Sequence, residues 1–162
     1  MKNGKGTVTK VTGTDNSKAA KSVMLSYVAK GKKKAPITKV AANVFNNKTG
    51  KKITAVMLKT YKGATMTVNA KAFNKSKAKK IYLVAKKGKI VLNKNAFKGK
   101  TGDKVKFVVT AKSKANITFK KGAFTGIGKK STMTVKGMTK KNFKAFKKAV
   151  QKAGFKGKIT RK

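Results

Sequence analysis

Negative charge is almost absent from this sequence. Among 162 residues there are 45 lysine or arginine residues but only two acidic ones, Asp15 and Asp103, so the formal net charge at pH 7 is +43. Histidine, cysteine and glutamate are missing altogether. A pair of catalytic carboxylates would require Asp15 and Asp103 to meet, and a Ser-His-Asp arrangement is impossible. The same missing residue types argue against disulfides and metal sites, so we expect no catalytic residue, metal or cofactor.

Arginine is nearly as scarce, because Arg161 is the only one. Arginine supplies the planar fork that reads guanine edges and clamps phosphates, whereas lysine acts as a hydrated point charge. This composition argues against sequence-specific reading of DNA. It favours delocalised attraction to any polyanion.

Long apolar runs are also lacking. No segment approaches the roughly 18 residues of a membrane span, and Met1 is followed by a polar stretch with no apolar signal region. Two interpretations stay open: a secreted or cell-surface protein whose signal has been removed, or a cytoplasmic protein. The hydrophobic share of 39% is enough to build the core of one domain.

A short sequence motif recurs along the chain. Phe45, Phe73, Phe97 and Phe124 each follow a small or β-branched residue, at separations of 28, 24 and 27 residues. Each phenylalanine is followed by a polar turn and then by an apolar, β-branched run. These runs lie at 51–58, 79–85, 103–110 and 129–135, and shorter runs lie at 64–70, 89–95 and 115–121. We expect strands in these runs, a short helical corner at each phenylalanine, and an interior column of phenylalanine rings.

Such spacing is typical of stacked repeats, because a unit of about 25 residues cannot bury its own apolar face. The sequence therefore predicts a mostly β repeat solenoid with short corner helices and a C-terminal capping α-helix. The expected organisation is an N-terminal tail or capping hairpin at 1–21, stacked repeats at 22–137, and a capping helix and tail at 138–162.

The "AF-x-G" steps in "NAFKG" and "GAFTG", and the stretch "ITKVAANVF" at 37–45, resemble the BspA-type leucine-rich repeats of bacterial surface proteins. The resemblance covers roughly residues 22–162. The sequence departs from the family pattern in having only four leucines and in placing Lys100 and Ile127 where the family often has Cys or Asn. The resemblance implies that the solenoid is leucine-rich-repeat-like, and that it is a secreted or surface-attached array used for adhesion or ligand binding. It supplies no ligand.

Residues 138–155 carry signals for both ends of a helix. Thr139 is a candidate N-cap, Met138 and Phe143 are spaced as a hydrophobic staple, and Gly154 with Phe155 is typical of a C-terminal cap. We expect a helix near 139–153 that covers the last layer of the core. A membrane-surface helix is the alternative.

Lysines recur just ahead of the predicted strands. Stacking would align them into a ladder, where like charges about 5 Å apart in water repel by about 0.8 kcal/mol and an anion would relieve the repulsion. The predicted polyanion-binding residues are Lys51, Lys52, Lys79, Lys80, Lys104, Lys106, Lys129 and Lys130. The alternative is that these lysines only keep the protein soluble.

These observations predict a non-enzymatic, strongly cationic binding or adhesion domain of a bacterial surface or secreted protein. Its expected partners are acidic glycans, teichoic acid or anionic membranes. Two alternatives remain: an intracellular protein that binds nucleic acid without sequence preference, and a supercharged or membrane-active cationic protein. The oligomeric state is not predicted.

Overall fold

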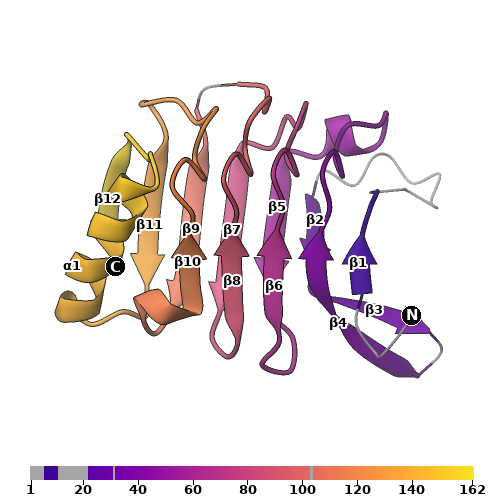
Figure 1. The fold of residues 1–162 in the computed structure, drawn as a ribbon, viewed down its shortest axis with the longest axis horizontal. Helices are drawn as coiled ribbons and strands as arrows, with labels where there is room; N and C mark the ends of the chain where they lie inside the picture. Colours follow the sequence, from indigo (N-terminus) through magenta and orange to yellow (C-terminus); the bar gives the residue numbers. More distant parts are fainter. Residues whose placement is uncertain (1–5, 11–21, 31, 103) are drawn as a thin grey trace.

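The computed structural model describes residues 6–10, 22–30, 32–102 and 104–162. Two β-sheets pack face to face, and the chain passes from one sheet to the other and back as it advances (Figure 1). Asp15 and Asp103 lie outside the described residues, as does most of the predicted N-terminal segment 1–21. The predicted division of the chain at residues 21 and 137 stays a prediction.

The sheet that faces the viewer in Figure 1 is called the front sheet here. Its strands, in spatial order, are β1 (Gly6–Val8), β4 (Lys33–Val40), β6 (Thr65–Val68), β8 (Lys89–Leu92) and β10 (Ile117–Phe119). These strands pair in parallel, and β3 (Tyr27–Lys30) adds an antiparallel hairpin to β4.

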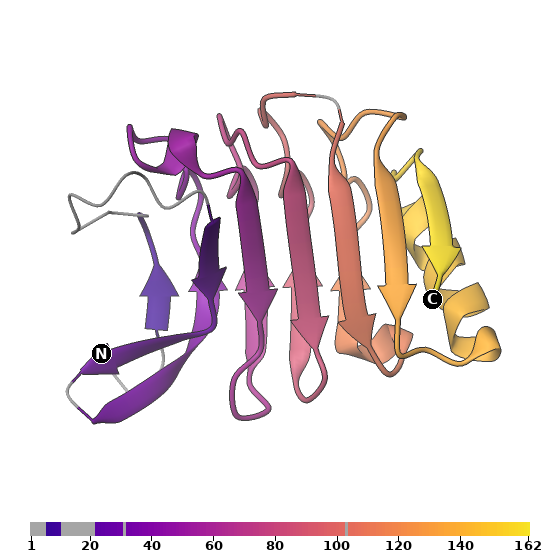
Figure 2. The same cartoon turned by 180° about the vertical axis from the view of Figure 1, so that it is seen from behind.

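The other sheet, called the back sheet, is turned toward the viewer in Figure 2. Its strands, in spatial order, are β12 (Lys158–Arg161), β11 (Thr132–Lys136), β9 (Lys106–Ala111), β7 (Lys80–Ala85), β5 (Ala55–Lys59) and β2 (Ser22–Leu25). All of these neighbours pair in parallel. Side chains alternate along each strand, so one set points into the space between the sheets and the other points outward.

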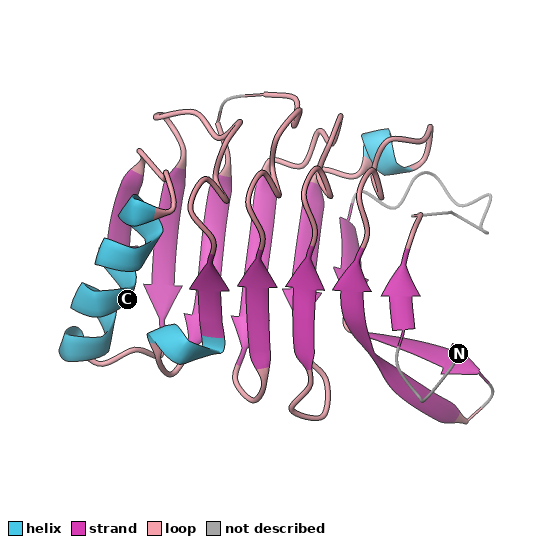
Figure 3. Cartoon of the chain, in the orientation of Figure 1, coloured by secondary structure: helices cyan, strands magenta, loops and turns pink. Residues whose placement is uncertain are grey.

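The fold class predicted from the sequence is wrong. In place of a leucine-rich-repeat-like solenoid with corner helices, the described residues form two six-stranded sheets, parallel except for β3, with one α-helix (Figure 3). The shorter apolar runs, such as 64–70 and 89–95, contain full strands of a second sheet. The two 3₁₀ helices in the described residues, η1 (Gly50–Lys52) and η2 (Lys114–Asn116), lie away from the "AF" steps.

Backbone geometry explains why the "AF" steps are turns. Asn43, Lys71, Asn95 and Gly122 have φ values of 61°, 56°, 61° and 75° just before the steps. This left-handed conformation cannot continue a right-handed helix. The backbone N–H of each of the first three donates to the carbonyl of the next in this series, so the turns themselves are stacked.

The turn that follows Phe124 also approaches its neighbouring turn closely. At Gly126, where φ is 92°, an added Cβ would lie 2.6 Å from the carbonyl oxygen of Phe97 in the neighbouring turn. Only glycine tolerates both this conformation and this proximity. The turns can therefore stack at the spacing that the strands impose.

The predicted phenylalanine column is confirmed. Phe45, Phe73, Phe97 and Phe124 are all buried, with centroid distances of 5.0, 4.9 and 5.7 Å between successive rings. Phe107 of the back sheet meets the rings of Phe97 and Phe124 edge-on, at 5.5 and 5.6 Å. The column therefore joins the stacked turns to the core between the sheets.

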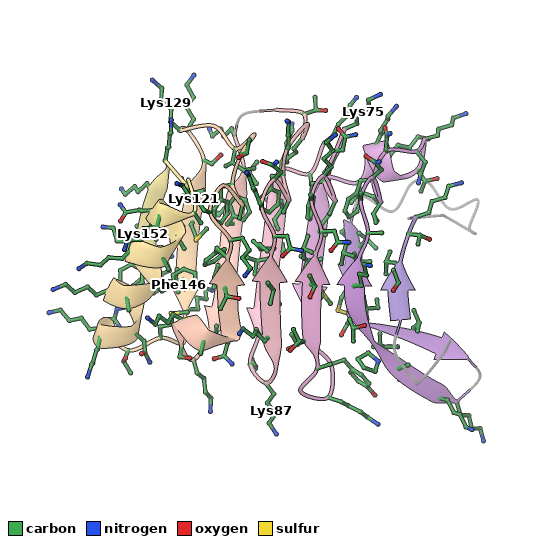
Figure 4. All side chains as sticks on the ribbon, viewed as in Figure 1. Lys75, Lys87, Lys121, Lys129, Phe146 and Lys152 are labelled. Atoms are coloured by element: carbon green, nitrogen blue, oxygen red, sulfur yellow. The ribbon has the colours of Figure 1, made fainter. Side chains whose placement is uncertain are left out.

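The α-helix expected near 139–153 lies at Lys140–Lys152 (α1). At its N-terminal end, Thr139 Oγ1 accepts a hydrogen bond from the backbone N–H of Asn142. At its C-terminal end, the backbone N–H of Phe155, the residue after Gly154, donates to the carbonyl of Val150. Phe146, labelled in Figure 4, is fully buried and meets Phe119 of β10 with centroids 5.5 Å apart. The helix thus covers the exposed end of the front sheet.

Replacing Phe97 by alanine tests the column. We expect Phe97→Ala to lower the free energy of unfolding by about 3 to 5 kcal/mol, because a buried ring is lost and a cavity remains. Thermal or denaturant unfolding measures this change. The matched control is Lys98→Ala, at the next, exposed residue. Equal midpoints for the two variants would contradict an interior role for the ring.

Candidate functional site

The structure leaves all eight lysines of the predicted ladder exposed. Lys80 and Lys106 are direct partners in the register of β7 and β9. The next residues of this row are not lysines. Lys80 pairs on its other side with Ala55 of β5, and Lys106 pairs on its other side with Thr132 of β11. The structure therefore forms one aligned pair and no unbroken ladder.

The other predicted lysines are dispersed. Lys51 and Lys52 lie in η1, and Lys129 and Lys130 lie in the turn that precedes β11. Lys79 and Lys104 line a separate pocket, described below.

A groove on the outer face of the back sheet contains the aligned pair. It has a volume of about 260 Å³. Its lining consists of Lys80, Tyr82, Lys106, Val108, Thr134, Lys136 and Lys162. We call it the four-lysine groove, after Lys80, Lys106, Lys136 and Lys162.

The register of the sheet places these four lysines as two pairs. Lys80 and Lys106 are neighbours where β7 and β9 begin, while Lys136 ends β11 beside the last residue, Lys162. The partner of Lys136 on β9 is Thr110, four residues beyond Lys106. Four residues of strand span about 13 Å, so the two pairs lie at opposite ends of the groove.

Between the two pairs lies a less polar floor. Tyr82, Val108 and Thr134 are in register on adjacent strands and are half-buried. A tyrosine ring beside aliphatic groups offers a flat surface for a sugar ring or a base, and the lysines at both ends supply positive charge. The groove can therefore hold a chain that is both flat and acidic.

A second hollow continues this face toward β5. Its volume is about 760 Å³, and it is lined by Tyr61, Met57 and Val84 together with Lys59, Lys62, Lys86 and Lys87. The register makes Met57 the direct neighbour of Tyr82, so the hollow and the groove share one face of the sheet.

Contacts between two tyrosine rings, and between lysines and these rings, lie at the edge of this hollow. The ring of Tyr61 lies 5.1 Å from that of Tyr27, Lys62 Nζ is 5.7 Å from the Tyr61 centroid, and Lys34 Nζ is 4.9 Å from the Tyr27 centroid. Cations over ring faces gain electrostatic attraction. In this way the ammonium groups are held beside the rings.

Sequence reasoning missed Tyr82, Lys136 and Lys162 as parts of one site. Alternation along β11 places Thr132, Thr134 and Lys136 on one face, and that signal is readable from the sequence. The approach of Lys136 to Lys162, and of Tyr82 to Val108, depends on strand register. Register cannot be read from any single segment.

Among the described residues, no acidic side chain is present to offset the positive charge of the lysines. Both aspartates fall outside the ranges that the structure describes. Lys75 and Lys129 extend from turns at one end of the sheets, Lys87 from a turn at the other, and Lys152 from the helix (Figure 4).

One lysine differs from the rest in its surroundings. Lys100 is only 9% exposed, and burial lowers the pKa of its amine from 10.5 to about 8. Its Nζ donates a hydrogen bond to the carbonyl of Thr101 at 2.8 Å. A pocket of about 280 Å³ adjoins it, lined also by Lys77, Lys79, Gly102 and Lys104.

Comparison with protein-family models, curated proteins and solved structures finds no match for this chain. Within the described ranges, no helix combines the length and apolar character needed to cross a membrane. The same ranges contain no group of three or more His, Cys, Asp or Glu residues placed to hold a metal ion.

The buried amine of Lys100 should make stability depend on pH. Because folding lowers its pKa, the unfolded chain binds more protons than the folded chain between about pH 8 and 10.5, and the free energy of unfolding rises through that interval. We expect Lys100→Met to raise the melting temperature at pH 7 and to lose this advantage above pH 10.5. The matched control is Lys98→Met, at an exposed position. An identical pH profile for the two variants would contradict the burial of the amine.

Salt should stabilise the unliganded protein. At about 0.5 M salt the screening length shrinks to a few ångströms, which weakens repulsion between neighbouring lysines. We expect the melting temperature to rise steadily with NaCl up to this concentration, as measured by circular dichroism. A falling melting temperature would mean that repulsion between the lysines does not limit stability.

Proposed function

We propose that this chain is a non-enzymatic binding domain for acidic polymers, and that the outer face of the back sheet is its principal contact surface. The four-lysine groove supports this proposal most directly. It places two pairs of lysines at the ends of a floor built from Tyr82, Val108 and Thr134.

The spacing of the lysines favours a polymer over a small anion. Each pair would concentrate positive charge on one acidic group, and an anion placed there offsets repulsion within the pair. The two pairs are about 13 Å apart along the strand direction, so one extended chain could reach both. The adjoining hollow of Tyr61 and its lysines lengthens the same path.

The composition of the face favours recognition by charge density. Lysine ammonium groups attract carboxylate, sulfate and phosphate alike and lack the bidentate geometry that selects one of them. We therefore expect acidic glycans and teichoic acid as partners, with nucleic acid bound only without sequence preference. An adhesive role on a bacterial surface, with secretion of the chain, is part of the proposal and is supported by the resemblance in the repeat sequence.

The binding face can be tested by removing equal charge from two places. One variant carries Lys80→Gln, Lys106→Gln, Lys136→Gln and Lys162→Gln. The matched control carries Lys140→Gln, Lys144→Gln, Lys147→Gln and Lys148→Gln, four exposed changes on α1. We expect the groove variant to lose at least about tenfold more affinity for heparin than the helix variant, measured by titration calorimetry.

The salt dependence gives an independent measure of the same contacts. With single-stranded DNA as the probe, each lost phosphate contact should reduce the slope of log affinity against log salt by about 0.7, or about 3 for four contacts. Equal losses in the two variants would show that only total charge matters. Binding that stays tight at about 1 M salt would overturn the proposal that charge drives association.

A further inference from the structure

The side chain of Lys100 occupies an interior position of a repeated turn. Ser76, Lys100 and Ile127 each follow a column phenylalanine by three residues, and each backbone N–H donates to the carbonyl of that phenylalanine. All three side chains are buried. Lys100 therefore stands where the neighbouring turns place a small hydroxyl group and an apolar group.

The pocket beside Lys100 is small, and four of the six described residues that line it are lysines. Lys77 and Lys79 reach it from the segment before β7, and Lys104 reaches it from the segment before β9. All three are exposed, whereas Lys100 is not. Its volume of about 280 Å³ suits a small molecule, whereas the four-lysine groove shares its face of the back sheet with a second hollow.

Desolvation changes the chemistry of the Lys100 amine. With a pKa of about 8, roughly one tenth of the amine is neutral at pH 7, whereas an ordinary lysine with a pKa near 10.4 is neutral in less than about one part in a thousand. A neutral amine is the nucleophile in Schiff-base formation, and burial beside other cations is a known way of producing one. The three neighbouring ammonium groups would attract an anion to the same place.

We propose that Lys100 is a covalent capture site for a small anionic aldehyde, with Lys77, Lys79 and Lys104 holding the anionic group while the amine forms an imine. The chemical class is an aldehyde that carries phosphate, sulfate or carboxylate. This site is distinct from the four-lysine groove and does not depend on polymer binding.

The reaction needs no co-reactant. The lone pair of the neutral amine attacks the carbonyl carbon, the C=O π electrons move to oxygen, and proton transfer from nitrogen to oxygen gives a carbinolamine. Loss of water then forms the C=N bond, so amine plus aldehyde yields imine plus water. One N–H of the starting amine is donated to the Thr101 carbonyl, which leaves the lone pair free for attack.

Pyridoxal 5′-phosphate is the probe, and 5′-deoxypyridoxal, which lacks the phosphate and keeps a free aldehyde, is the matched control without the phosphate charge. The wild-type chain is incubated with each at pH 7, the imine is fixed with borohydride, and modified lysines are located by peptide mass spectrometry. We expect labelling of Lys100 by the phosphate ester to exceed labelling of the exposed Lys98 by at least about tenfold. 5′-Deoxypyridoxal should label Lys100 at least about tenfold less than the phosphate ester does.

Two variants separate capture from general reactivity. Lys77→Gln, Lys79→Gln and Lys104→Gln together change only exposed side chains, so the fold should persist. Labelling by the phosphate ester should then fall toward the level seen with 5′-deoxypyridoxal. Lys100→Met should abolish the dominant labelled peptide. Labelling spread evenly over many lysines, or a Lys100 that stays unmodified while Lys98 reacts, would overturn the proposal.

Discussion

The stacking of four phenylalanine rings is the interaction on which the remaining architecture relies. Phe45, Phe73, Phe97 and Phe124 follow one another at centroid distances of 4.9 to 5.7 Å, close to the spacing of adjacent strands. Because both spacings agree, each turn can align with the next while the strands on either side keep their hydrogen bonds. The core then extends as a continuous column that α1 covers at one end.

This core has to outweigh an unusual self-repulsion. A net charge of +43 on 162 residues destabilises a compact state, and no described side chain is acidic. The two-sheet arrangement lowers the repulsion between lysines, because alternation along the strands points their lysines outward on both sheets. The lysines of the turns are also at the surface, and water and salt screen both groups. Lys100 is an exception to this arrangement, since its side chain is only 9% exposed.

The same charge serves two different kinds of recognition in our proposals. On the back sheet, Lys80, Lys106, Lys136 and Lys162 are hydrated groups around a flat floor, and their contribution depends on how many acidic groups a ligand presents at once. At Lys100 the contribution depends on the loss of hydration around one amine and on its neighbours around a small pocket. In these proposals, the hydration of its amine decides whether a lysine acts as a positive charge or as a nucleophile.

Local features of the molecule follow from its sequence alone. Alternation locates most of the strands, and Thr139 with Gly154 marks the helix ends, because each of these signals depends on residues close together in the chain. The near-constant spacing of 24 to 28 residues identifies the phenylalanine column, because a repeat in the sequence predicts a repeat in the structure. The absence of histidine, cysteine and glutamate likewise limits the available chemistry through composition alone. Tertiary contacts, by contrast, make the shorter runs a second sheet, interrupt the lysine row with Ala55 and Thr132, and bring Tyr82 beside Val108. They also bury Lys100. These outcomes depend on register between strands 24 to 27 residues apart and on which side of a turn faces the core. Neither is set by a local pattern.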